Sequence, residues 1–133
     1  MNVKQQEIQL LIFSLGNSRY GIDIDQVAYL MNVDATESAI SFEQLMAVGS
    51  LAECKYSKIL VIKHRMGIPI LIQEPDEVVT FSVWDICSLP EVLTVSAANK
   101  GVWGLLPQEQ GIIILIDFYK NQHFMQIASR IDH

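Results

Sequence analysis

The sequence predicts a mainly β protein with about seven short strands and two or three short helices. Three observations support this fold class. Apolar and polar residues alternate over short stretches, turn residues recur at short intervals, and 50% of the 133 residues are hydrophobic whereas 18% are charged. A chain of this length can bury a core without disulfides or metals. Short strands with frequent turns are typical of barrels or a sandwich, and we expect residues 1–133 to form one domain.

The clearest element is a hairpin near the N-terminus. Residues 8–15 form its first predicted strand, and Gly16–Arg19 supply the turn. In the return strand Tyr20, Ile22 and Ile24 alternate with Gly or Asp, which is the pattern of a half-buried strand. No further strand is predicted between this hairpin and residue 41.

A short central helix is predicted to begin at a capping box. Ser41 and Gln44 have the spacing at which each side chain satisfies the other residue's free amide. Gly49 is a plausible end of this helix. Its apolar face has helical spacing: Phe42, Leu45 and Met46.

Five more strands are predicted at residues 59–62, 68–72, 78–83, 101–106 and 111–118. We expect turns at residues 63–67, at Pro75-Asp76 and around 107–110, and one helical turn at 85–89 before Pro90. Pro69 has no amide proton, so its strand is expected to lie at a sheet edge or to begin there. A C-terminal helix is predicted within residues 119–131 from the spacing of Phe124, Ile127, Ala128 and Ile131.

The charge of the chain argues against polyanionic partners. The net charge is −6, and nine scattered basic residues face fifteen acidic ones. Nucleic acids and anionic membranes attract clustered Lys and Arg, so neither is expected as a partner. No apolar run approaches the ~18 residues of a membrane span, and no signal peptide is recognisable, so we expect the protein in the cytoplasm.

No pattern indicates a cofactor or a metal. His64, His123 and His133 lie far apart and lack metal-ligand spacing, and neither a P-loop nor a nucleophile elbow is present. Cys54 and Cys87 are interpreted as reduced structural thiols.

Catalysis is the least favoured class. An enzyme would need a cleft holding two or more of five residues and a strongly shifted pKa. These are Asp23, Asp25, His64, Cys87 and His123. Asp23 and Asp25 are instead expected to share a solvated strand face. Trp84 and Trp103 are interpreted as core or semi-buried anchors, with interface hot spots as the alternative.

The hairpin at residues 11–27 resembles the opening of CheW-like domains, which has the pattern F-x-L-x-x-x-x-Y/F-x-I/L-D/P-I followed by Val. The matching residues are Phe13, Leu15, Tyr20, Ile22, Ile24 and Val27. Later stretches resemble the family in the same order: 59–73, 76–78, 89–90, 102–104 and 115–117. The resemblance implies two intertwined five-stranded β-barrel subdomains around a shared core. It also implies a scaffold role, since CheW couples chemoreceptors to the histidine kinase CheA without catalysis.

The chain departs from the family between Val33 and Phe42. The family's G-x-x-N-L-R-G segment and its strand pair are absent there, together with an Arg associated with receptor contact. Arg65 lies in a later hairpin and does not replace it. One subdomain should therefore be smaller. Its unpaired edges should be covered by residues 33–53 or by a second copy of the protein.

Two functional hypotheses follow. The first is a non-enzymatic adaptor that docks to a CheA-type histidine kinase, to chemoreceptors or to both. For its interface the sequence suggests the turn at Gly67 and the strand with Ile68 and Ile70. The alternative is a self-associating β-barrel that binds a small ligand in a deep apolar pocket, or an unrelated regulatory protein.

Overall fold

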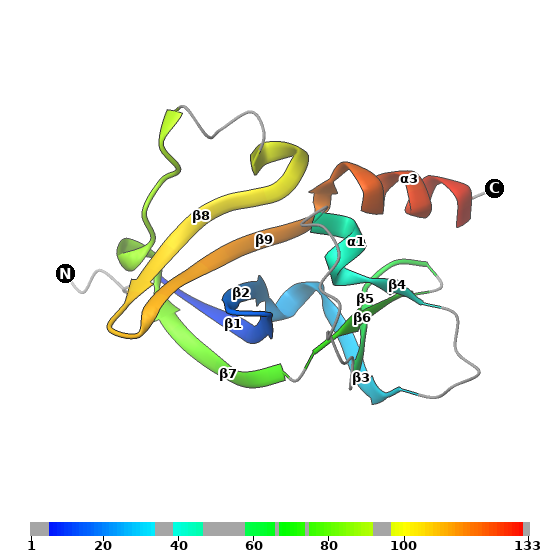
Figure 1. Cartoon of the computed structure of the whole chain (residues 1–133), viewed down its shortest axis with the longest axis horizontal. Coiled ribbons are helices and arrows are strands. Elements are labelled where there is room, and N and C mark those ends of the chain that lie inside the picture. Colours follow the sequence, from blue (N-terminus) through cyan, green and yellow to red (C-terminus); the bar gives the residue numbers. More distant parts are fainter. Residues whose placement is uncertain are drawn as a thin grey trace.

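The strands form two sheets, which we call sheet A and sheet B (Figure 1). The computed structural model describes residues 6–33, 39–46, 58–65, 67–73, 75–91 and 97–131. Sheet A has the order β7-β1-β2-β9-β8. Its strands are β1 (Glu7–Leu15), β2 (Ser18–Asp23), β7 (Pro75–Ser82), β8 (Lys100–Gln108) and β9 (Gly111–Asn121).

Sheet B has the order β3-β5-β6-β4 and so has one strand fewer. Its strands are β3 (Val27–Asn32), β4 (Ile40–Ser41), β5 (Lys58–Ile62) and β6 (Ile68–Ile72). The described helices are α1 (Phe42–Met46), α3 (Gln122–Ile131) and two 3₁₀ turns, η1 (Ile24–Gln26) and η2 (Val83–Asp85).

The chain passes from sheet A to sheet B and back, which confirms the prediction of two intertwined β-subdomains. The two ends of the chain meet in sheet A, where β2 pairs in parallel with β9 from Arg19↔Ile113 to Ile22↔Ile116. The expected closure into barrels is wrong, however. Within the described residues both sheets have free edges, formed by β7 and β8 in sheet A and by β3 and β4 in sheet B.

Several predicted elements are confirmed. The first hairpin is β1–β2, and Gly16 in its turn has a φ of 60°, which glycine adopts without strain. The capping box is present, because the Gln44 amide donates to Ser41 Oγ and the Ser41 amide donates to Gln44 Oε1, both at 3.2 Å. The predicted helix end at Gly49 lies outside the described residues.

The structure corrects four local predictions. Residues 27–32 form β3, a strand that the sequence pattern did not predict. Pro75 begins β7 opposite Phe13, so Pro75-Asp76 is not a turn. Residues 86–89 are not helical, and Cys87 forms a β-bridge with Leu105. The last hairpin turns at residues 109–110, so Pro107 lies within β8.

The two positions expected for the strand with Pro69 differ in outcome. β6 is an inner strand of sheet B, next to the edge strand β4, so it does not lie at the edge, but it begins at Ile68, one residue before Pro69. β4 pairs with Ile70 and Leu71 alone. Pro69 lies beyond this short pairing, which is compatible with its missing amide proton. As β4 belongs to the segment 33–53, this segment covers part of a sheet edge, as expected.

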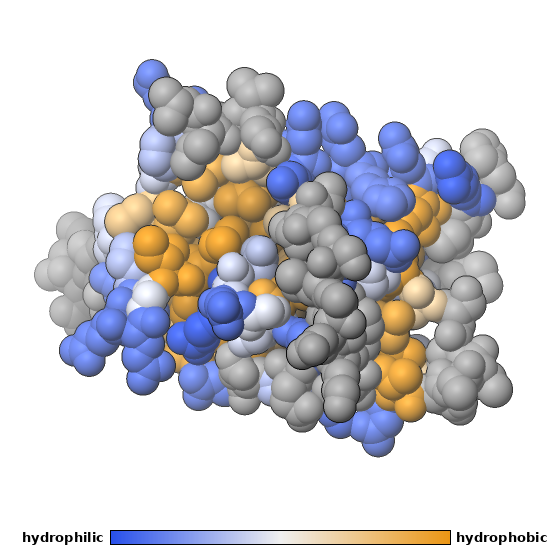
Figure 2. All heavy atoms as spheres, in the orientation of Figure 1, coloured by the Kyte–Doolittle hydropathy of each residue, from blue (hydrophilic) through white to orange (hydrophobic). Residues whose placement is uncertain are grey.

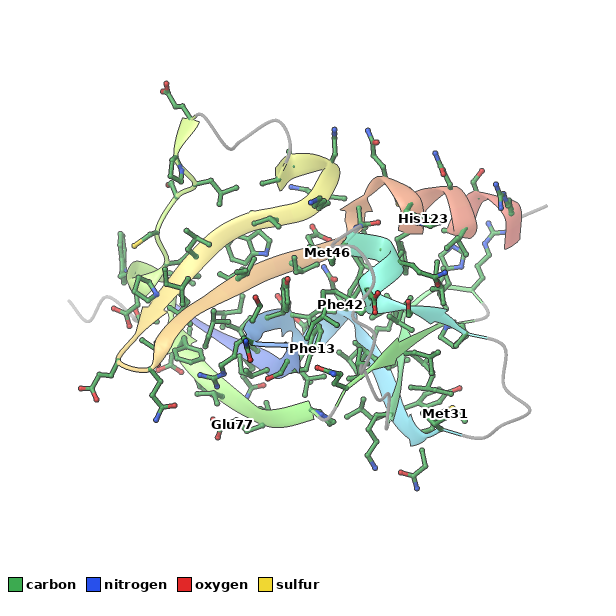
Figure 3. All side chains as sticks on the ribbon, in the orientation of Figure 1. Phe13, Met31, Phe42, Met46, Glu77 and His123 are labelled. Atoms are coloured by element: carbon green, nitrogen blue, oxygen red, sulfur yellow. The ribbon has the colours of Figure 1, made fainter. Side chains whose placement is uncertain are left out.

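The main core lies between the two sheets and centres on Phe42. Its ring makes edge-on contacts with Phe13 at 4.8 Å and Tyr20 at 4.9 Å between ring centroids, as the neighbouring labels of Phe13 and Phe42 in Figure 3 illustrate. Phe118 and Phe124 extend the cluster to β9 and α3. A second cluster lies on the other face of sheet A. Its members are Leu10, Ile12, Leu106, Ile113 and Leu115.

Within the described part of the chain, one polar side chain is buried, that of Asn121, which is 1% exposed. Its Nδ2 donates to the carbonyl oxygens of Leu45 at 3.0 Å and Lys100 at 2.9 Å. Its Oδ1 accepts from the Phe124 amide at 2.9 Å, which caps α3. One side chain thereby joins α1, β8, β9 and α3.

A second polar cluster joins the sheets near Gln26. Gln26 Nε2 donates to Asp117 Oδ1 at 2.8 Å, and Gln26 Oε1 accepts from the Phe118 amide at 3.1 Å. The Tyr119 hydroxyl donates to the Lys63 carbonyl. Burial and the nearby Asp117 carboxylate raise the pKa of Tyr119.

Candidate protein interface

The residues considered for catalysis do not form one site. Asp23 and Asp25 line a cleft of about 350 Å³ together with Glu7, but His64, Cys87 and His123 do not line it. Asp23 Oδ1 accepts from the Asp25 amide at 2.9 Å, so this carboxylate caps a 3₁₀ turn. In the described ranges no three His, Cys, Asp or Glu side chains are placed to share a metal ion.

The two cysteines differ from expectation where they can be observed. Cys87 is exposed, so it is not the buried structural thiol that its apolar sequence context predicted. Its main chain nevertheless has a structural role, because it exchanges hydrogen bonds of 2.8 and 2.9 Å with Leu105. Cys54 and His133 lie outside the described residues.

The sequence-derived interface residues lie at the turn into β6. Ile68 and Ile70 are 1% and 0% exposed and belong to the main core. Gly67 is half-buried with a φ of +72°, and its amide donates to the His64 carbonyl at 3.0 Å. The isoleucine side chains thus face the protein's own interior. Contact between this turn and a partner protein stays a prediction. Such a contact would involve the main chain of the turn and the exposed side chain of Arg65.

Neither tryptophan lies in the core. Trp84 is 78% exposed in η2, so its interpretation as a core or semi-buried anchor is wrong, whereas Trp103 is 39% exposed in β8, which is compatible with a semi-buried anchor. Large exposed aromatic side chains are enriched at protein–protein interfaces. For Trp84 the interface alternative is therefore the one compatible with its exposure.

Trp103 lies beside an apolar surface that we call the β8–β9 face. In the register of the two strands Leu105 lies opposite Ile114, and Pro107 lies opposite Ile112. Opposed residues of antiparallel strands share one face of the sheet, so these four residues define the face. Trp103 precedes them in β8, at the register shift between Val102 and Gly104. Ile112 is 53% exposed and Pro107 is exposed, whereas Leu105 and Ile114 are half-buried.

The β8–β9 face is continuous with the main core. Along β9 the same row of side chains runs from exposed Ile112 through half-buried Ile114 to fully buried Ile116 and Phe118. Figure 2 shows apolar side chains gathered over β8 and β9. Neither the four residues that define the face nor the adjacent Trp103 is charged, so a partner could cover this surface without burying an unpaired charge.

The other face of the same hairpin borders a cleft of about 450 Å³. Five of its nine lining residues are polar or charged, among them Arg19, Glu77 and Glu109. The ligand-binding alternative requires a deep apolar pocket with only a few polar groups, and this cleft does not have that character. In Figure 3 Glu77 lies on β7, on the side of the molecule away from His123 on α3.

Sequence reasoning missed the β8–β9 face, although one signal was present. Residues 112–116 are apolar without interruption, which means that both faces of β9 are apolar. The second core cluster covers one face through Ile113 and Leu115. The opposite face then needs another cover, and the main core covers Ile114 in part and Ile116 and Phe118 fully, whereas Ile112 stays exposed.

Comparisons with known proteins bear on the fold. No protein-family model matches the sequence, and no curated protein matches it. Among solved structures, the chain is similar to the scaffolding protein TtCheW from Thermoanaerobacter tengcongensis, with a TM-score of 0.64 and 20% sequence identity. The match covers 84% of this chain and 90% of that one. In the described part of the chain no helix is long and apolar enough to span a membrane. The chain therefore has a CheW-like fold.

Proposed function

We propose that this chain is a non-enzymatic adaptor of chemotaxis-type signal transduction in the cytoplasm. It would dock to a CheA-type histidine kinase, to chemoreceptors or to both, as one domain over residues 1–133. The observation that carries the proposal is the uncharged apolar face of β8 and β9 on a CheW-like fold. The fold supports the class of partner, and the face supports the mode of binding.

Docking on the β8–β9 face would extend the core into the interface. A partner would cover Ile112 and Trp103 and complete the burial of Leu105 and Ile114. Standard interfaces bury about 800 Å² on each partner, with aromatic anchors near their centre. Trp103 is suited to such a position, because its ring contributes a large area and β8 fixes its backbone.

Binding measurements with two matched variants test this proposal. The full chain is titrated with the regulatory region of a CheA-type kinase and with a receptor signalling fragment. Ile112→Lys places a charge on the β8–β9 face and should weaken binding at least about tenfold, because a buried unpaired charge costs more than 1.4 kcal/mol. Val78→Lys is the control, since Val78 is 52% exposed but lies on β7 at the opposite edge of sheet A.

The outcomes separate the parts of the proposal. If neither partner binds the unmodified chain, the adaptor role is refuted although the fold stands. If Ile112→Lys and Val78→Lys bind as well as the unmodified chain, the role stands but the β8–β9 face is not the site. Arg65→Glu then tests the turn at Gly67, because Arg65 is exposed in that turn.

A further inference from the structure

β3 forms a free edge of sheet B. Its register with β5 is regular from Tyr29↔Val61 to Asn32↔Lys58, and no strand of the described chain pairs with its other side. In an antiparallel pair alternate residues direct their N–H and C=O groups outwards. β3 therefore presents unpaired main-chain donors and acceptors to another strand.

The side chains of this edge are apolar and exposed. Tyr29 is 56% exposed, Leu30 is 40% exposed, and Val33 just beyond the strand is 41% exposed. Met31 lies among them on β3, at the margin of the molecule in Figure 3. Neither a charged residue nor a proline occurs between residues 26 and 33. Proteins commonly protect free edges with lysine, other charges, proline or a β-bulge. β3 lacks the first three, and its register shift lies between Val27 and Tyr29, before the regular stretch.

The other sheet edges are less suited to pairing with a strand. β7 carries the exposed carboxylate of Glu77, so two copies of it would bring like charges together. On β8, Cys87 already bridges Leu105. β4 consists of two residues. β3 is thus the edge with regular pairing over four residues and no charge.

We propose that a second copy of this chain pairs with β3 in antiparallel orientation, which joins two copies of sheet B across a twofold axis. A twofold axis perpendicular to the sheet pairs residues of the same face. Centred on Leu30, it places Leu30 opposite its own counterpart and Tyr29 opposite Met31 of the partner subunit. Ala28 and Asn32 of the partner subunit would flank this stretch, with Ala28 at the register shift between Val27 and Tyr29.

The absence of charge on β3 favours a second copy as the occupant. Each chain carries a net charge of −6, but residues 26–33 are uncharged, so the pairing brings no carboxylates of β3 into contact. The Lys58 ammonium donates to Asn32 Oδ1 at the end of β3, so one cation borders each end of the pairing. Charges farther apart than ~8 Å are largely screened at physiological ionic strength. A short interface of this kind is expected to be weak, with a dissociation constant of about 10–100 µM. This inference is independent of the proposed adaptor function.

Sedimentation velocity of the full chain from about 5 to 500 µM, which brackets that range, tests the pairing. A concentration-dependent dimer is expected. Tyr29→Lys should weaken it at least about tenfold, because two lysines would flank the twofold axis in an apolar contact. Val78→Lys and Ile112→Lys should leave the dimer unchanged. Circular dichroism and thermal unfolding of each variant verify that it folds.

Hydrogen exchange gives an independent measurement. The amides of residues 28–32 that point away from β5 should exchange more slowly as the concentration rises. If the chain stays monomeric over the whole concentration range, the proposal is overturned. A strand of another protein then becomes the expected partner of β3. A dimer that Ile112→Lys dissociates and Tyr29→Lys does not would overturn it as well, because the β8–β9 face would then be the contact.

Discussion

Replacing Asn121 by Ala should destabilise the protein by about 3 kcal/mol, because three hydrogen bonds of one buried side chain are lost. Each such bond contributes about 0.5–1.5 kcal/mol, which gives about 1.5–4.5 kcal/mol in total. The Leu45 carbonyl loses its bond within the core, and α3 loses its cap at the Phe124 amide. Removal of a cap alone costs about 0.5–2 kcal/mol.

Urea unfolding followed by circular dichroism measures this loss. Gln122→Ala is the matched control, because the neighbouring side chain is exposed and makes one hydrogen bond of 3.2 Å to Asn99. The control should change the free energy of unfolding by less than about 0.5 kcal/mol. A loss below about 1 kcal/mol for Asn121→Ala would refute the role of Asn121 as a junction between the four elements.

Asn121→Asp tests the direction of these hydrogen bonds through the pH dependence of the free energy of unfolding. The carboxylate could still cap α3, but it would face two carbonyl oxygens to which Asn121 now donates. Burial and these oxygens would raise its pKa above the unfolded value of about 3.9. The native state would then bind more protons than the unfolded state, so the free energy of unfolding falls as the pH rises above about 4. The unmodified chain serves as the reference at each pH, and an unchanged difference from pH 4 to 7 would contradict this account.

Three further predictions concern the hairpins and the capping box. Gly101→Ala should cost at least about 2 kcal/mol in urea unfolding, because a φ of +84° is strained for alanine and its Cβ would lie 2.3 Å from the Asp117 carbonyl oxygen. Ser41→Ala should cost about 1 kcal/mol through loss of the capping box with Gln44, and Ser41→Asp should recover part of it. The raised pKa of Tyr119 means that the native state keeps its proton while the unfolded state loses it near pH 10, so stability should fall above that pH. Tyr119→Phe should make this fall smaller in thermal unfolding at pH 9 to 11.

The sequence predicted the local elements best where large apolar residues recur at the period of the element. In β2 large Tyr20 and Ile22 are separated by Gly21, and α1 buries Phe42, Leu45 and Met46 at helical spacing, so periodicity indicated both. β3 was missed for the opposite reason. Its residues 28–30 are all exposed although two of them are large and apolar, so no alternation marks them as a strand.

The candidate interface could not be predicted because it depends on pairing between distant segments. Ile70 and Ile112 have similar apolar contexts in the sequence, yet one is 0% and the other 53% exposed. The difference arises because β6 lies between β5 and β4 over the main core, whereas the start of β9 extends beyond it. The apolar character of a segment therefore did not distinguish core from surface, and the topology was needed to locate the β8–β9 face.

The two apolar surfaces lie on different sheets, and this separation has a mechanical consequence. Pairing at β3 engages sheet B, while docking on the β8–β9 face engages sheet A. The surfaces are joined through the shared core, because Leu60, which pairs with Leu30, belongs to the same cluster as Ile116 and Phe118 of β9. Close-packed protein interiors deform little, so the shared core would hold both surfaces in a fixed relative orientation. A protein with that property can hold two partners in a defined geometry, which is the physical requirement of a scaffold.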